Sequence, residues 1–192
     1  MVEISRRRAI EDAASELFRE RGYAATSVRD IANALSIRGP SLYAHVASKE
    51  DVLAAIVERM ASRFEEAAER AWVDGSAADL LTSLVRGHVR VVTGDPGAAR
   101  VFVDEWRHLS RARRDAILAR RDAYEARFRQ AISSGIADGT FAVVDPAIAA
   151  TFLLTALNGV ADWYRMDGHL TPDQLADAYA DLAIRSLTEA PL

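Results

Sequence analysis

The chain has 192 residues, of which half are hydrophobic, and a formal net charge of −4 at pH 7, so it is long enough to bury a substantial core in one or two domains. Cysteine is absent, which excludes a disulfide framework and a thiolate metal site. The sequence has neither an apolar run long enough to cross a membrane nor the pattern of a secretory signal, so we expect a cytoplasmic protein with no membrane attachment.

The first predicted helix covers residues 5–21. Its apolar residues recur at the i, i+3, i+4, i+7, i+8 spacing of an amphipathic helix: Ile10, Ala13, Ala14, Leu17 and Phe18. Gly22 follows as the residue that closes the helix. We expect the apolar face of this helix to pack on the two short helices that come next.

Those two short helices lie between Ser27 and His45. Ser27 and Asp30 have capping-box spacing, and the apolar residues after them keep helical spacing up to Leu35. A second helix from Gly39 to His45 carries almost no charge. Two short helices joined by a tight turn are the helix-turn-helix geometry that reads the DNA major groove.

The remaining chain is also predicted to be helical. A long helix starts at the capping box of Ser48 and Asp51, runs to about Ala71 and is broken at residues 74–76. Further helices are expected over residues 77–92, 96–109, 110–137, from 146 to about 163, and 172–189. The fold class is therefore all-α with about nine helices, divided into a helix-turn-helix domain (1–47) and a helical ligand-binding and dimerisation domain (48–192).

The eighth predicted helix, which opens at Asp145–Pro146, is apolar almost all round. Such a helix has to be buried on every side, and in a chain of this size one side can face a partner subunit. We therefore expect the eighth and ninth helices to pair with their symmetry mates as a four-helix bundle in a homodimer. The alternative is that both helices only line the core of the monomer.

The helix-turn-helix segment resembles the DNA-binding module of the TetR (tetracycline repressor) family of bacterial regulators. The matching residues are Ile31, Ala32, Ile37, Leu42, Tyr43, His45, Ser48, Lys49 and Glu50, and upstream Phe18, Gly22, Tyr23 and Thr26. The chain departs from the family pattern at Ser36, where glycine is usual in the turn, and at Arg38, where a small polar cap is usual. A serine forced to positive φ costs about 1 kcal/mol relative to glycine.

The resemblance implies that a homodimer binds a palindromic operator in double-stranded DNA. It places Arg38, Gly39, Pro40 and Ser41 at base edges and nearby phosphates, Tyr43, His45 and Lys49 at phosphates, and Ser27 and Val28 at the DNA backbone. The Arg38 guanidinium also matches guanine O6 and N7, so we expect it to contact a base. The alternatives are a packed Tyr43 with a solvated hydroxyl and a surface His45 without DNA contact.

The charge distribution agrees with this interpretation. Residues 1–50 hold eight basic and seven acidic residues, so the remainder of the chain carries a net charge of −5. Phosphate binding requires a local basic surface and not a basic protein.

No catalytic or metal-binding motif is present, so we expect no enzyme, no cofactor and no metal site. The 48–192 domain is instead predicted to bind a small hydrophobic effector, and a weaker resemblance to TetR-like regulators of lipid and sterol breakdown implies an acyl-CoA. The candidate ligand residues are Phe102, Trp106, Arg107, Arg121, Phe128, Phe152, Trp163 and Arg165. The competing hypotheses are a helical interaction protein and an activator without a small-molecule effector.

Overall fold

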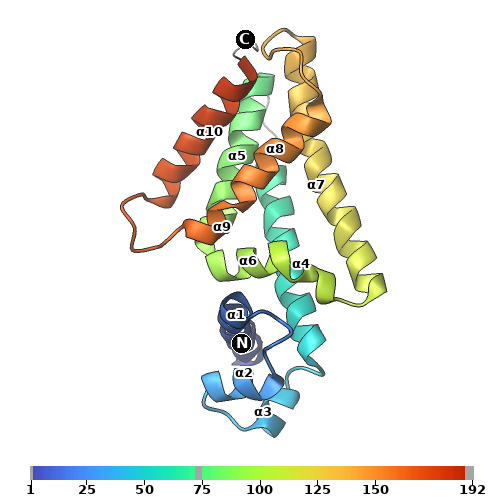
Figure 1. Ribbon diagram of the computed structural model, residues 1–192, viewed down its shortest axis with the longest axis vertical. Helices are drawn as coiled ribbons and strands as arrows, with labels where there is room; N and C mark the ends of the chain where they lie inside the picture. The colour runs from blue at the N-terminus through green and yellow to red at the C-terminus, as the bar shows by residue number, and fades with distance from the viewer. Residues whose placement is uncertain (1, 72–74, 189–192) are drawn as a thin grey trace. The chain divides into compact units, whose positions relative to one another are not determined.

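The computed structural model describes residues 2–71 and 75–188, and it shows helices and no strands within these ranges (Figure 1). The all-α prediction is therefore confirmed for the described residues, none of whose helices is long and apolar enough to cross a membrane. The helices are α1 (Val2–Arg21), α2 (Val28–Ala34), α3 (Gly39–Tyr43), α4 (Lys49–Arg70), α5 (Ala77–Gly94), α6 (Pro96–Asp104), the 3-10 helix η1 (Trp106–His108), α7 (Arg111–Ala137), α8 (Pro146–Asn158), α9 (Val160–Trp163) and α10 (Pro172–Thr188).

The chain divides into two compact units. Unit 1 consists of Met1–Ala61 and Gly97–Leu118, and unit 2 of Ser62–Pro96 and Ala119–Leu192. The division falls inside α4 and α7, so each of these helices contributes residues to both units.

Unit 1 is built on the apolar face of α1. Ile10, Ala14 and Phe18 on α1 are fully buried, as are Ile31 on α2 and Leu42 on α3. These are the residues that the helical spacing predicts to face inward. The core therefore fixes α2 and α3 against α1 and leaves their other faces for solvent or a partner.

The turn between α2 and α3 contains Ser36 at φ +55°, in the left-handed region. We expect Ser36→Gly to raise the free energy of unfolding by up to about 1 kcal/mol, because glycine enters this region without steric cost. Ser41→Gly is the matched control: Ser41 lies inside α3, where glycine is expected to lower stability. Urea unfolding measures both changes, and a loss of stability in Ser36→Gly contradicts the assigned strain.

In unit 2, α5 packs along α10 (Figure 1). The start of α5 is fixed by a capping box in which the Asp79 N–H donates to Ser76 Oγ. The Asp145 carboxylate caps α8 by accepting hydrogen bonds from the N–H groups of Ala147 and Ile148. The cap predicted at Asp145 is therefore formed, whereas the capping box of Ser76 and Asp79 was not predicted.

Several helix ends differ from the prediction: α1 begins at Val2 instead of residue 5, and α3 ends at Tyr43 instead of His45. The eighth predicted helix is divided at Gly159 into α8 and α9, where the Asp162 N–H bonds to the Gly159 carbonyl only three residues back. The sixth ends at Asp104 instead of residue 109, because the chain tightens into η1 and thereby buries Leu109. Residue 74, in the predicted break at 74–76, and residue 189, at the predicted end of the ninth helix, lie outside the described residues.

Candidate functional site

The α3 helix presents an exposed face that starts at its N-terminal cap. Arg38 caps α3 with extended backbone, and Pro40 lies in the first turn, where a missing N–H costs no hydrogen bond. Leu42 anchors the helix in the core, while Arg38, Pro40, Ser41 and Tyr43 are exposed on the other side, with Tyr43 at 56%. An apolar anchor and an outward row of polar and aromatic groups are the arrangement of a groove-reading helix.

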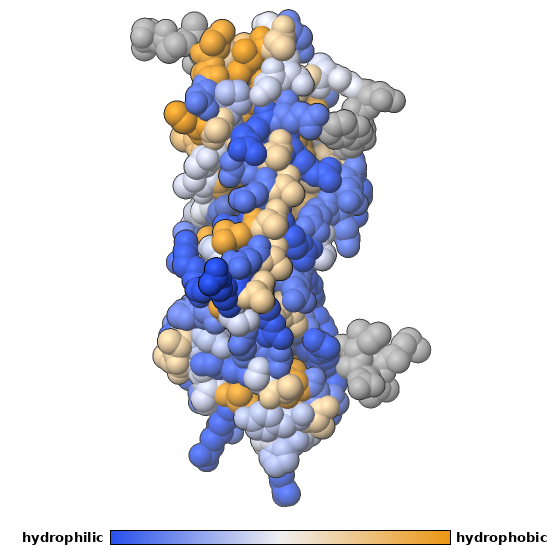
Figure 2. Space-filling view, turned by 90° about the vertical axis from the view of Figure 1, so that its right-hand side faces the viewer, coloured by the Kyte–Doolittle hydropathy of each residue, from blue (hydrophilic) through white to orange (hydrophobic). Residues whose placement is uncertain are grey.

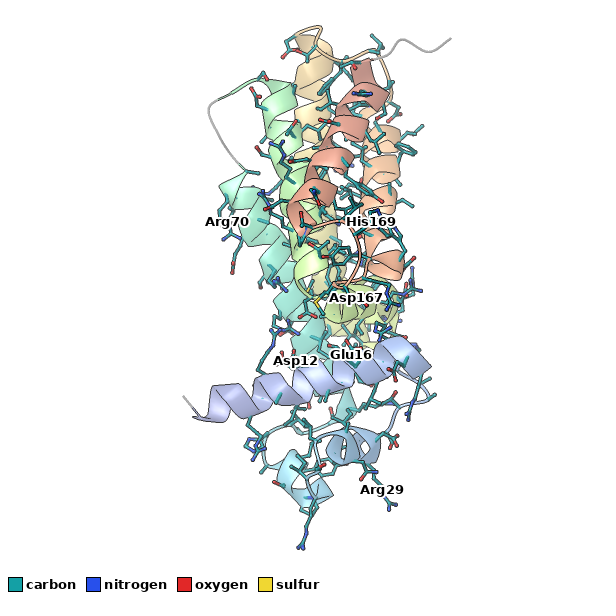
Figure 3. The ribbon with its side chains drawn as sticks, turned by 90° about the vertical axis from the view of Figure 1, so that its left-hand side faces the viewer. Asp12, Glu16, Arg29, Arg70, Asp167 and His169 are labelled. Carbon is teal, nitrogen blue, oxygen red and sulfur yellow. The ribbon has the colours of Figure 1, made fainter. Side chains whose placement is uncertain are left out.

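Ser27 and Val28, which are predicted to contact the DNA backbone, lie at the start of α2. This helix packs against α3. Ser27 is exposed and accepts a hydrogen bond from the Asp30 N–H at 3.2 Å, and Val28 is half-buried. Gly39 and His45 are also half-buried, so both remain partly accessible. Arg29 was missed by the sequence reasoning, although it adjoins Ser27 and Val28; its side chain is exposed and points away from the ribbon of α2 (Figure 3).

Lys49 is engaged within unit 1. Its ammonium donates to the carbonyls of Tyr23 at 2.8 Å and Thr26 at 2.7 Å, and lies 4.2 Å from the centroid of the Tyr23 ring. This side chain thus ties the start of α4 to the segment between α1 and α2. The geometry gives Lys49 a structural task that the motif alone did not indicate.

A second set of contacts joins the start of α4 to the start of α7, also within unit 1. Arg113 Nη2 lies 2.6 Å from Asp51 Oδ1, and the Ser110 N–H donates to Glu50 Oε1 at 2.9 Å. The hydrogen bond from Arg113 lowers the pKa of Asp51, and the hydrogen bond from the Ser110 backbone lowers the pKa of Glu50. The N-terminal turn of α4 is therefore held by Lys49 and by this network.

The sign of these pKa shifts predicts how stability depends on pH. Because the folded pKa of Asp51 is below its ordinary value, the network stabilises the fold above about pH 4 and loses its effect as pH falls through the lowered folded value. We therefore expect Arg113→Met to destabilise the protein at pH 7 and to have a smaller effect at pH 3, which lies below the ordinary pKa of Asp51.

Urea unfolding at both pH values measures this difference. Arg111→Met is the matched control, because Arg111 lies two residues before Arg113 in α7 but is exposed and has its carboxylate partner at 3.8 Å. An Arg113→Met effect of the same size at pH 7 and pH 3 contradicts the role given to the carboxylates.

Trp106 and Arg107, two of the predicted ligand residues, share a pocket in unit 1. The Arg107 guanidinium carbon lies 5.2 Å from the centroid of the Trp106 ring. Phe102 is buried in the same unit. The structure thus brings two of these three residues to one accessible site.

Arg121 and Phe128 lie in unit 2, near a buried polar pair that the sequence reasoning missed. His88 Nδ1 is 3.1 Å from the Tyr124 hydroxyl, and the rings of Phe64 and Phe128 pack around the pair. Burial lowers the pKa of His88 to about 3; the Asn158 side chain opposes this shift, and the positive charge of Arg121 adds to it. His88 is therefore neutral at pH 7.

This pair has an unused hydrogen-bonding atom. His88 is 2% exposed, yet no hydrogen bond of normal geometry reaches its Nε2 atom within the described residues. Burial also raises the pKa of Tyr124, so both side chains are uncharged. A signal was present in the sequence, because His88 follows Leu81, Leu84 and Val85 on one face of its helix.

The other predicted ligand residues are on the surface. Phe152 and Trp163 are exposed large hydrophobic residues, and the Arg165 side chain bonds to Asp167, which is exposed (Figure 3). Figure 2 shows one side of the molecule, where hydrophilic residues predominate and hydrophobic residues form separate small groups. Exposed aromatic residues on α8 and α9 therefore need an explanation other than core packing.

Comparisons with known proteins cover both parts of the chain. Residues 10–56 match the family model "Bacterial regulatory proteins, tetR family", and residues 74–187 match "Tetracyclin repressor-like, C-terminal domain". The chain is 30% identical over 188 residues to the HTH-type transcriptional repressor KstR2 of Rhodococcus jostii, covering 95% of this chain and 91% of that protein.

Two solved structures are similar over nearly their whole length. The ketosteroid transcriptional regulator KstR2 of Mycobacterium tuberculosis superposes with a TM-score of 0.85 at 25% identity and covers 96% of both chains. AibR in complex with isovaleryl coenzyme A and operator DNA gives a TM-score of 0.80 at 29% identity, covering 92% of this chain and 97% of AibR.

Proposed function

The chain belongs to the TetR family of bacterial regulatory proteins, a family of transcriptional regulators and not of enzymes, and we propose that it represses transcription by binding a palindromic operator as a homodimer. The observation that carries this proposal is the exposed face of α3, which is anchored by Leu42 and presents Arg38, Ser41 and Tyr43 outward. Residues 1–47 form the DNA-binding domain in this account, and residues 48–192 bind the effector and the partner subunit.

Each exposed residue of this face has a proposed task. Arg38 donates to guanine O6 and N7, because its planar fork matches that pair of acceptors. Tyr43 and His45 bond to phosphates, and Gly39, Pro40 and Ser41 lie against base edges and the adjacent backbone. Ser27, Val28 and Arg29 contact the DNA backbone from the start of α2. Lys49 ties the start of α4 to the segment between α1 and α2.

The dimer is proposed to form through α8 together with α9 and α10. The exposed side of α8 is a stripe of apolar and small residues, with Ile148 at 70% and Phe152 at 61% exposed. Leu182 on α10 is also exposed. A twofold interface buries these residues against their own copies and presents two α3 helices to successive major grooves about 34 Å apart.

The effector is proposed to bind next to the His88–Tyr124 pair of unit 2. This site combines aromatic walls with one buried acceptor or donor atom, His88 Nε2, to which no hydrogen bond of normal geometry is made in the described part of the chain, although the Asn158 side chain lies near enough to His88 to oppose the lowering of its pKa. Buried polar atoms are rarely left unpaired, so a ligand group that bonds to Nε2 is favoured there. Phe64 belongs to α4, so the ligand contacts the helix whose first turn carries Lys49.

We propose an acyl-CoA as the effector class, since AibR was solved with isovaleryl coenzyme A and shares this fold and family. The test is a thermal-shift panel of acyl-CoAs, free acids and aromatic compounds beside an operator gel-shift assay. A ligand at 100 times its Kd stabilises the fold by about 2.7 kcal/mol, which raises Tm by about 5–10 °C. If CoA thioesters neither raise Tm nor release DNA, this assignment is wrong.

A further inference from the structure

Unit 1 carries a pocket of about 530 Å³ where η1 leads into α7. This volume lies within the range of pockets that hold small organic ligands. Trp106 and Leu118 supply the apolar part of its wall, and the other lining residues are charged: Arg107, Arg111, Arg114 and Asp115.

The charges in this pocket are unbalanced. Three guanidinium groups face one carboxylate, and that carboxylate, on Asp115, lies 3.8 Å from the Nε atom of the exposed Arg111. Neither Arg107 nor Arg114 forms an ion pair with a carboxylate among the residues that the structure describes; Arg114 Nη1 instead donates to the Arg107 carbonyl at 3.4 Å. Two cations are thus available to a ligand.

The side chains that line the pocket indicate which class of ligand it binds. Guanidinium forks match the geometry of phosphate oxygens and bind them with charge-assisted hydrogen bonds. An indole beside a guanidinium provides a flat surface on which a planar ring can stack. A free inorganic anion uses only the first of these features, whereas a ring-bearing phosphate uses both.

We propose that this pocket binds a small organic phosphate with a planar ring, of which an adenine nucleotide is the simplest example. The site is built from η1 and α7 in unit 1 and shares no residue with the His88–Tyr124 pair. The first turn of α7 also carries Arg113, which holds Asp51 at the start of α4. A ligand here binds the same compact unit that contains α2 and α3.

Isothermal titration calorimetry of the full chain with ADP, adenosine and pyrophosphate tests the proposal without DNA. We expect ADP to bind about tenfold more tightly than either fragment, because only ADP engages both the guanidinium groups and the aromatic wall. Arg107→Ala combined with Arg114→Ala is expected to weaken ADP binding at least about tenfold.

Arg129→Ala is the matched control, since Arg129 is an exposed arginine of the same helix outside the pocket. It should bind ADP as the wild type does, and circular dichroism verifies that both variants are folded. Absence of ADP binding, equal binding of pyrophosphate and ADP, or unchanged binding in the double variant each overturn the proposal. Because no DNA is present, these results are separate from any failure of operator binding.

Discussion

Replacing Tyr43 with alanine is expected to abolish operator retention while leaving the fold and the dimer intact. Tyr43 is 56% exposed on α3, so its removal costs little packing energy. A hydrogen bond from its hydroxyl to a phosphate contributes about 1.5–3 kcal/mol, and a homodimer loses two such bonds. The operator Kd should therefore rise about 100-fold or more in a gel-shift or fluorescence-anisotropy titration.

Tyr43→Phe separates the hydroxyl from the ring. We expect it to lose most of the affinity that alanine loses, because only the phosphate contact disappears. Thermal unfolding and sedimentation of both variants should match the wild type. A Tyr43→Ala protein that footprints like the wild type shows that α3 has been wrongly assigned as the recognition helix.

Replacing Phe152 with aspartate is expected to dissociate the dimer. Phe152 lies in the middle of the exposed apolar stripe of α8, and a twofold axis brings two copies of each interface residue into one interface. Two unpaired carboxylates buried there cost several kcal/mol, so sedimentation should shift from dimer to monomer. The affinity for the operator should fall when the dimer dissociates, because a monomer engages only one half-site.

Leu118→Asp is the matched control for this experiment. It places the same charge on an exposed apolar residue of α7, away from α8 and α10 in the sequence, and should leave the oligomeric state unchanged. If the Phe152→Asp protein still sediments as a dimer, the interface is formed by other residues. A wild-type chain that is a stable monomer contradicts the homodimer itself.

The local elements of the DNA-binding module were predictable because their signals are local. The capping box of Ser27 and Asp30 depends on residues three apart, and the structure shows both of its hydrogen bonds. Ser36 at positive φ was anticipated because the family pattern places glycine in that turn. Helix periodicity likewise predicted the burial of Ile31 and Leu42.

The features that the sequence did not predict depend on contacts between distant segments. Lys49 bonds to carbonyls more than 20 residues away, and Arg113 holds residues from another helix, so no local pattern indicates either role. The division at Gly159 was missed because the apolar run continues on both sides of it. His88 lies on α5 and its partner Tyr124 lies 36 residues away on α7, so no local pattern indicates this pair.

Selection of bound sequences from a pool of random DNA duplexes shows whether the chain reads a palindromic operator as a homodimer. We expect the wild type to enrich an inverted repeat whose half-sites lie about one helical turn, or a multiple of it, apart. We also expect Arg38→Ala to relax the preference for one G·C pair in each half-site. Enrichment of no sequence, or of an unpaired half-site alone, contradicts a homodimer that reads its operator through α3.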